Sequence, residues 1–162
     1  TIRDLFLVSQ ALEKYRRSDL LKNEGGQTSF GWAILTNGGA VGVITADWCS
    51  RFGVKLVSVV DILGDANSEK YQTALISLLK QKEINGVIFC QTLQTMTDSA
   101  RNSKIIIEAQ KQFLEKPILP LFLGGKITKK GSGLLEKSNC IVCQEPRDVA
   151  FVASILSERL NF

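Results

Sequence analysis

Short apolar runs and helical stretches alternate along this chain from residue 30 onward, and this alternation restricts the fold more than any other feature. The apolar runs lie at residues 30–36, 55–60, 86–92, 117–124 and 139–143. Helical stretches follow them at residues 41–52, 67–82, 98–115, 128–138 and 146–160. The runs are nearly continuous in hydrophobic residues instead of alternating with polar ones. Such strands, separated by helices, are typical of a parallel sheet with both faces covered.

Right-handed crossovers leave few topologies for five parallel strands. They favour an α/β fold with a flavodoxin-like doubly wound sheet in the order 2-1-3-4-5. Pro120 lies inside the fourth run and lacks the N–H group that a strand donates, so this strand is predicted to be short or irregular. An extra amphipathic helix is predicted in front of the sheet at residues 2–16, with apolar side chains at helical spacing: Leu5, Val8, Leu12 and Tyr15. We therefore expect residues 1–29 to form this helix and a polar connector, and residues 30–162 to form the α/β domain.

The chain contains no histidine, and this excludes several kinds of chemistry. Without histidine it has no imidazole base, no histidine metal ligand and no phosphohistidine of its own. Cys140 and Cys143 have the spacing of a metal knuckle, but they lie in an apolar run without a second pair of ligands. We therefore predict no metal site.

Charge and cysteine usage point to a cytoplasmic protein without a nucleic-acid or membrane partner. The net charge is +4, and the basic clusters at residues 16–17 and 129–130 are too short for a nucleic-acid arm. The apolar runs are far shorter than the roughly 20 residues that span a bilayer. Four cysteines, most of them in apolar runs, fit buried reduced thiols better than disulfides.

The chain begins with Thr1, which predicts a processed chain or one piece of a larger protein.

A glycine-rich stretch, TNGGAVG at residues 36–42, follows the first predicted strand. In the order 2-1-3-4-5, ligands bind where strands one and three end, and this stretch lies there together with residues 91–98. Gly38 and Gly39 permit positive φ and place no Cβ in the way of a ligand. A helix that starts near Val41 would present unpaired N–H groups to an anion. The pattern alone fits two interpretations, a phosphate cradle or a turn that needs glycine only for its geometry.

Other polar residues are also expected near this edge of the sheet. In the second loop, Gln91 and Thr92 offer uncharged hydrogen-bonding groups, and Asp98 is expected to cap the next helix. Asp61, after the second run, is expected to form a turn, and Lys126 in GGK either assists an anion or is simply solvated. There is no GxxxxGK[ST] or GxGxxG motif, so a free nucleotide or flavin is less favoured than another anionic group.

Several stretches resemble one enzyme family in the same order. ILTNGGAVGVITADWC (34–49) resembles VTNAGGPGVLAADAC, which opens a ligase domain of NDP-forming acyl-CoA synthetases, the ADP-forming acetyl-CoA synthetases among them. VDILGDANSEKYQTAL (60–75), INGVIFCQT (84–92), KPILPLFLGG (116–125) and EPRDVAFV (145–152) resemble later pieces of that domain. The carboxy-terminal ligase domain of the succinyl-CoA synthetase β subunit is similar as well. The chain departs from the family pattern at Ala40, which replaces a glycine, and at Val41, which replaces a proline.

The resemblance implies a role in a reaction shared among domains. In this family a histidine of another ligase domain carries a phosphoryl group between a CoA-binding site and an ATP-grasp domain, and two helix N-termini hold the phosphohistidine. This chain would supply one of them, carry no catalytic residue, and bind no cofactor alone, whereas the parent enzyme uses CoA, ADP/ATP or GDP/GTP, and Mg. The implied phosphate-binding residues are Asn37, Gly38, Gly39, Ala40, Val41, Gly42, Gln91 and Thr92.

Two other functions remain open at this point. The same domain set occurs in proteins that resemble acyl-CoA synthetases fused to protein acetyltransferases, where this domain would be a non-catalytic regulatory or assembly module. A free-standing flavin or nucleotide binder is the third hypothesis, and it predicts a chromophore or nucleotide that is retained through purification.

Overall fold

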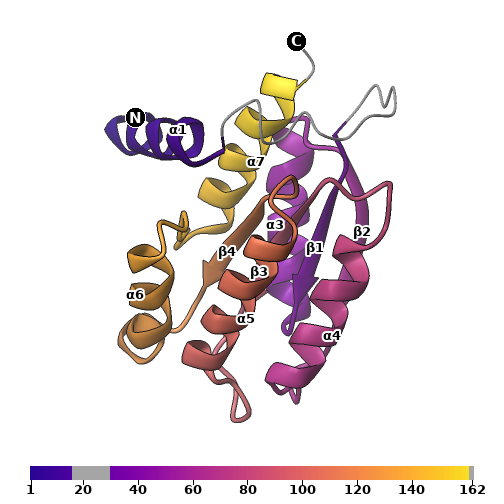
Figure 1. Ribbon diagram of the computed structural model, residues 1–162, viewed down its shortest axis with the longest axis vertical. Coiled ribbons are helices and arrows are strands. Elements are labelled where there is room, and N and C mark those ends of the chain that lie inside the picture. Colours follow the sequence, from indigo (N-terminus) through magenta and orange to yellow (C-terminus); the bar gives the residue numbers. More distant parts are fainter. Residues whose placement is uncertain (16–29, 161–162) are drawn as a thin grey trace.

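A four-stranded parallel sheet forms the centre of the computed structural model, which describes residues 1–15 and 30–160 (Figure 1). The strands are β1 (Trp32–Thr36), β2 (Leu56–Asp61), β3 (Gly86–Gln91) and β4 (Ile118–Phe122), in the order β2-β1-β3-β4. All neighbouring strands run parallel. The predicted α/β class and the order of the first four strands are confirmed. The predicted connector at residues 17–29 lies outside the described residues.

Helices cover both faces of the sheet, as the apolar runs predict. One face packs against α3 (Gly39–Arg51) and α7 (Pro146–Leu160), which contact each other closely. The other face packs against α4 (Ser68–Leu79), α5 (Ser99–Gln112) and α6 (Lys129–Lys137), and α6 is preceded by the short 3-10 turn η1 (Gly125–Thr128). Figure 1 shows α5 in front of the sheet and α3 behind it. Because every strand leads into a helix, the N-termini of α3, α4 and α5 lie at the carboxyl edge of the sheet, at the bottom of Figure 1.

The predicted fifth strand at residues 139–143 does not form among the described residues. It is reduced to one isolated parallel bridge, between Leu121 and Cys143. The outer edge of β4 explains this, because its backbone groups are already used or missing. At Ile118 the N–H donates to Gln110 Oε1 at 2.9 Å. Pro120 accepts from the Cys143 N–H at 2.9 Å but has no N–H group to return. β4 itself pairs with β3 in unbroken register through Pro120. The effect of Pro120 is therefore seen in residues 139–143, which form one bridge to β4 instead of a strand.

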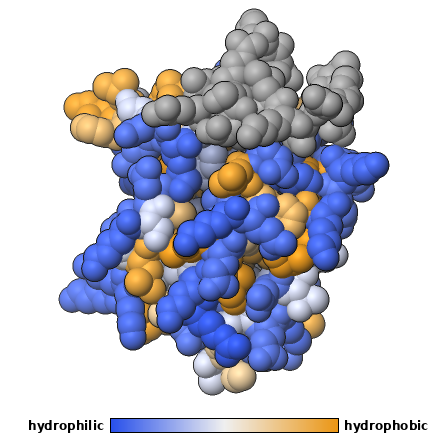
Figure 2. All heavy atoms as spheres, viewed as in Figure 1, coloured by the Kyte–Doolittle hydropathy of each residue, from blue (hydrophilic) through white to orange (hydrophobic). Residues whose placement is uncertain are grey.

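The extra N-terminal helix is present as α1 (Ile2–Lys14), but its buried face differs from the predicted one. Leu7, Ala11 and Tyr15 are buried, whereas Leu5 is 67% exposed and Leu12 is 38% exposed. The helix packs on α7. Of the four predicted residues, Tyr15 is buried and Val8 is half-buried, whereas Leu5 and Leu12 lie outside the contact. Its free end consequently exposes large apolar side chains, which form the hydrophobic area at the upper left of Figure 2: Ile2, Leu5 and Phe6.

Ion pairs attach α1 to the start of α7. Arg147 Nη1 lies 2.7 Å from Asp4 Oδ1, and Arg3 Nη2 lies 2.5 Å from Asp148 Oδ2. The hydrogen bond from Arg147 holds the pKa of Asp4 well below its usual range, while burial raises the pKa of Asp148. These opposite shifts mean that acid would weaken the Asp4 contact while relieving the burial cost of Asp148.

Three of the four cysteines lie in the core of the domain. All four cysteines are free, and Cys49, Cys90 and Cys143 are buried. Among the described residues, no group of histidine, cysteine, aspartate or glutamate could hold a metal ion. None of the described helices is long and apolar enough to cross a membrane.

Replacing Gly131 by alanine is expected to destabilise the protein by about 1–3 kcal/mol, because α5 and α6 approach each other too closely for a side chain there. A Cβ atom on Gly131 would lie 2.5 Å from the backbone oxygen of Ser99, and Ser103 Oγ donates to the Gly131 carbonyl at 2.9 Å. Urea unfolding measures the effect. Gly133→Ala is the matched control in the same helix. Its Cβ would meet open space, so we expect a gain of about 0.5–1 kcal/mol from helix propensity. Equal effects of the two substitutions would contradict the packing argument.

Candidate functional site

The loops after β1 and β3 meet at the carboxyl edge of the sheet and are joined by one buried side chain. Asn37 is 1% exposed and bonds to Thr92 three times. Its Oδ1 accepts from the Thr92 N–H at 2.8 Å and from the Thr92 hydroxyl at 2.9 Å, and its Nδ2 donates to the Thr92 carbonyl at 3.1 Å. Asn37 therefore fixes the glycine-rich loop to the third-strand loop at the predicted switch point.

The N-terminus of α3 lacks the capping groups that satisfy other helices of this chain. Asn67 Oδ1 caps α4 and Asp98 Oδ1 caps α5, each accepting a backbone N–H at 3.0 Å. In α3 the N-cap is Gly38, which has no side chain to accept such a bond, and no acidic residue lies in the first turn. Gly39 and Ala40 are exposed. The first amides of α3 therefore face solvent at the positive end of the helix dipole, where an anion is stabilised.

The glycines of this loop have close neighbours and no positive φ. Gly38 is extended, with φ of −147°, and Gly39 is helical. A Cβ atom on Gly38 would lie 3.0 Å from two side-chain atoms of Thr92. One on Gly39 would lie 3.0 Å from Asp61 Oδ2, and one on Gly42 would lie 3.0 Å from Thr36 Cγ2. Thr36 also supports the turn, because its hydroxyl bonds to both the N–H and the carbonyl of Gly38 at 3.0 Å.

Asp61 brings a carboxylate to the start of α3, which the sequence did not predict. Its Oδ1 accepts from the Leu63 N–H at 2.8 Å, forming the expected turn. This bond leaves Oδ2 beside Gly39. The signal was available in the topology, because β2 is the neighbour of β1 and their ends share one edge of the sheet. Asp61 complements the helix dipole itself and would compete electrostatically with a bound phosphate.

Removing this carboxylate is expected to strengthen phosphate binding at α3. Asp61→Asn keeps the acceptor for the Leu63 N–H but removes a negative charge a few ångströms from the amides, so we expect about 3- to 10-fold tighter binding of inorganic phosphate. Backbone amide shifts of residues 39–41 during a phosphate titration give the affinity. Asp65→Asn is a matched control on the neighbouring turn, where Asp65 is paired with Lys70 at 3.1 Å. An unchanged affinity in Asp61→Asn would show that this carboxylate does not face the anion.

Gln91, which was predicted to face the glycine-rich loop, points to a different part of the domain. It is fully buried, and its Oε1 accepts from Asn102 Nδ2 of α5 at 2.8 Å. The other atoms of these two amides, Gln91 Nε2 and Asn102 Oδ1, have no partner among the described residues. The structure thus brings together seven of the eight predicted site residues at the start of α3, with Thr92 among them, and places the Gln91 side chain under α5.

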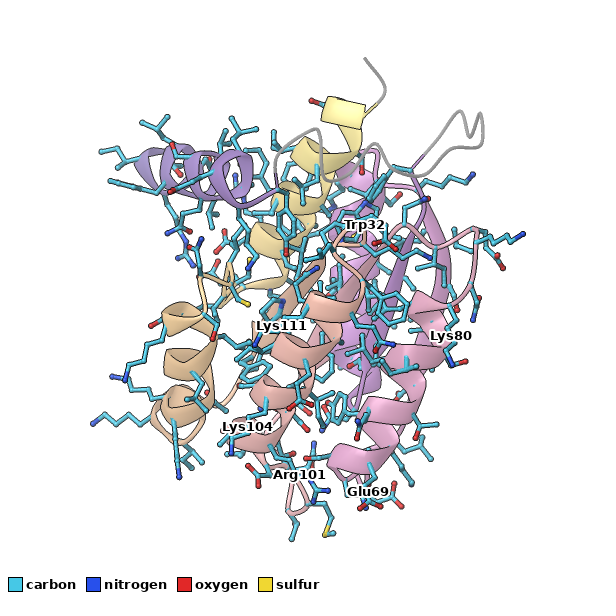
Figure 3. All side chains as sticks on the ribbon, in the orientation of Figure 1. Trp32, Glu69, Lys80, Arg101, Lys104 and Lys111 are labelled. Atoms are coloured by element: carbon cyan, nitrogen blue, oxygen red, sulfur yellow. The ribbon has the colours of Figure 1, made fainter. Side chains whose placement is uncertain are left out.

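An apolar groove flanks the first turn of α3 on the side of β2. Its lining includes Gly39, Val43, Ala46, Val59 and Asp61. Val43 is 70% exposed and Val59 is 50% exposed, which is unusual for valine on a helix and a strand that face each other. On the opposite side of the edge, Arg101 of α5 pairs with Glu69 of α4 at 3.4 Å, at the bottom of Figure 3. The exposed backbone N–H groups at the start of α3 therefore have the apolar groove on the β2 side and the Arg101–Glu69 ion pair on the opposite face of the sheet.

Comparisons with known proteins agree with this architecture. No protein-family model matches the chain. It is 28% identical over 151 residues to the alpha subunit of ADP-forming acetate–CoA ligase II of Pyrococcus furiosus, covering 78% of this chain and 33% of that subunit. It is 26% identical over 159 residues to ADP-forming acetate–CoA ligase I of Archaeoglobus fulgidus, covering 85% of this chain and 21% of that protein. The chain therefore spans one third or less of these curated relatives.

Solved structures give the same result for the fold. The crystal structure of PH0766 from Pyrococcus horikoshii OT3 superimposes with a TM-score of 0.82 at 27% identity, over 98% of this chain and 40% of that one. The dinucleotide-forming acetyl-CoA synthetase 1 of Candidatus Korarchaeum cryptofilum, in complex with phosphate and ADP, has a TM-score of 0.81 at 20% identity, over 96% of this chain and 36% of that one. The homologues of this chain are thus ADP-forming acetyl-CoA synthetases and their subunits, as its motifs indicate.

Proposed function

We propose that this chain acts as one domain of an NDP-forming acyl-CoA synthetase and receives there the phosphohistidine of another domain. The overall reaction would convert acyl-CoA, ADP or GDP, and phosphate to the free acid, CoA, and ATP or GTP. The uncapped N-terminus of α3 carries this proposal, since its first amides are exposed at the switch point of the sheet. The absence of histidine from the chain fits a histidine supplied from outside. The similarity to acetate–CoA ligases supplies the reaction class.

In this proposal the backbone does the binding. The N–H groups of Gly39, Ala40 and Val41 would donate to the phosphoryl oxygens, and Asn37 would hold the loop in place through Thr92. Ala40 keeps the amide of the glycine that it replaces. None of the proposed binding residues carries a positive side chain, and Asp61 lies beside the amides. Neutral amides bind a phosphoryl group less strongly than cations do, and the nearby carboxylate of Asp61 repels it. Both effects favour binding that is weak enough to release the phosphohistidine.

The remaining chemistry would belong to partner domains. The chain has no P-loop or dinucleotide-binding turn, and its described residues offer no group of ligands for a metal ion. CoA, the nucleotide and Mg would therefore be held by a CoA-binding, histidine-bearing domain and by an ATP-grasp domain. The apolar groove beside α3 gives such a domain a surface to approach. In the same proposal, residues 30–162 form the ligase-like domain, residues 1–29 its leading helix and connector, and the assembly works in the cytoplasm.

Reconstitution tests the proposal. The chain is combined with the histidine-bearing and ATP-grasp parts of the parent protein, and acyl-CoA-dependent formation of ATP or GTP is measured with and without it. We expect no turnover from any part alone and turnover from the complete set. Turnover that is equally fast without this chain would refute a role in the reaction.

Asp61 and Ala40 favour one alternative, a regulatory or assembly module with a degenerate phosphate site. The Asp61 carboxylate at the start of α3 weakens the attraction for an anion, and the methyl group of Ala40 reduces the space for it. Such a module would bind partner domains without affecting the phosphohistidine. It predicts that the complete assembly forms and turns over with the same phosphohistidine level whether or not the amides of α3 are blocked.

A further inference from the structure

A second hollow lies at the carboxyl edge of the sheet, at the end of β4. It has a volume of about 330 Å³ and is enclosed by the end of β4, the turn η1, the first turn of α6 and the segment before α7. This volume is at the lower end of the range for small-molecule sites. Since β3 separates β4 from β1, the hollow is about 10 Å from the α3 loop across the sheet.

The side chains of this hollow combine hydrogen-bond donors with an apolar wall. The polar and charged residues come from three segments: Lys126, Thr128, Lys129, Ser132 and Gln144. The hydroxyls of Thr128 and Ser132 already donate to backbone carbonyls, which leaves the lysines and Gln144 as donors to a ligand. Phe122, Leu123 and Val142 form the apolar part. The lining contains no aspartate or glutamate. Neither Lys126 nor Lys129 forms an ion pair with the described residues, so both ammonium groups are available to a ligand.

The start of α6 adds to the positive potential of the hollow. Its N-cap, Thr128, makes no side-chain capping bond, and its hydroxyl donates to the Gly125 carbonyl at 3.1 Å. The Lys129 N–H donates to the Lys126 carbonyl of η1. Its first turn carries Lys129 and Lys130 and no acidic residue. Cations at this end of a helix oppose the dipole and cost stability. Residues that oppose their local structure in this way are found mainly at functional sites. An anion bound in the hollow would offset the repulsion between these lysines and the helix dipole.

The turn into η1 borders the hollow with two glycines. Gly124 has φ of +150° and Gly125 has φ of +55°, both in the region that favours glycine. A Cβ atom on Gly125 would meet nothing within 4 Å, so the backbone at this position borders open space. A larger residue at either position would strain the turn.

We propose that this hollow is a second anion site that takes a small organic phosphate with an apolar body. Two ammonium groups match the charge of a phosphate monoester, which is close to −2 at pH 7. The lining supplies lysines and no arginine, and lysine binds phosphate as a point charge. Phe122 and Val142 would contact the apolar body. The proposal does not depend on the function proposed for α3, because none of the residues that line the hollow belongs to that loop.

The test is a titration of the full chain followed by backbone amide resonances, with phenyl phosphate as the probe. We expect saturable shifts at residues 124–132 and 144. Inorganic phosphate should bind there several-fold more weakly, because it lacks the apolar part. Benzyl alcohol, which is neutral, and benzoate, which is a carboxylate, should bind at least about 10-fold more weakly than phenyl phosphate. Benzoate that binds as tightly as phenyl phosphate would refute the phosphate preference.

Variants with altered charge distinguish specific binding in the hollow from nonspecific attraction to the positive charge of the protein. Lys126→Gln with Lys129→Gln should weaken phenyl phosphate binding at least about 10-fold. The control, Lys80→Gln with Lys111→Gln, removes the same charge from the far ends of α4 and α5, which Figure 3 shows away from the bottom edge. It should change the affinity less than twofold. Equal losses in both variants, or no shifts at residues 124–132 in the unmodified chain, would overturn the proposal. Shifts confined to residues 39–41 would also overturn it, while leaving the α3 site intact.

Discussion

Replacing Gly39 by valine is expected to lower turnover of the reconstituted synthetase at least about 100-fold, because the new side chain would block the approach of the phosphoryl group to the first amides of α3. A Cβ atom on Gly39 would already lie 3.0 Å from Asp61 Oδ2, and the two methyl groups of valine extend further over the first amides of α3. The phosphohistidine level, followed with labelled phosphate, should fall in parallel with turnover.

Gly133→Val is the matched control for this experiment. It makes the same change in a helix where a Cβ meets open space, and it should leave turnover within about twofold of the unmodified protein. Dispersed amide resonances confirm that both variants fold. If Gly39→Val turns over normally in a folded assembly, the α3 amides do not hold the phosphoryl group, and the regulatory alternative is favoured.

Replacing Asn37 by aspartate is expected to destabilise the domain by about 3–5 kcal/mol. The carboxylate would keep the two bonds from the Thr92 N–H and hydroxyl but would place its second oxygen against the Thr92 carbonyl, where the amide now donates at 3.1 Å. A charge would also be buried at a position that is 1% exposed. Unfolding by urea at pH 7 measures the loss. Because the charge is the cause, stability should recover partly as the pH falls toward 4.

Asn67→Asp provides the comparison for Asn37→Asp. Asn67 caps α4 at the surface with one accepting oxygen, a role that aspartate fills equally well. We expect a change within about 0.5 kcal/mol, without recovery in acid. A similarly small effect at Asn37 would mean that the joint between the two loops contributes little to folding.

The sequence predicts most of this fold because hydrophobic periodicity is a strong signal where elements are regular. The continuous apolar runs place four strands, and Asp98 marks the start of α5. The fifth strand fails for a reason that lies outside its own sequence. Its partner edge has Pro120 at the position that would donate to it and a Gln110 side chain at Ile118. The exposed face of α1 is a similar case, since packing on α7 selects which stripe is buried.

The candidate site could be predicted as far as topology determines it. Asn37 and Thr92 follow adjacent strands, so their contact follows from the strand order. Gln91 also ends β3, but successive residues of a strand face opposite sides of the sheet, and a run that is apolar on both faces does not reveal which side Gln91 takes. Asp61 was recognised as a turn residue, yet its position beside Gly39 depends on the Leu63 turn, which brings its carboxylate back toward α3.

The closed outer edge of β4 has a consequence for how the molecule meets others. Open strand edges are templates for pairing with a further chain and are a common start of aggregation. Here Pro120, the Gln110 side chain and the Tyr15 hydroxyl, which donates to the Ile118 carbonyl at 3.2 Å, leave little backbone for such pairing. A neighbouring domain or a second copy of the chain is therefore hindered from extending the sheet across β4, and any strand pairing with another chain is directed to the other edge of the sheet, at β2.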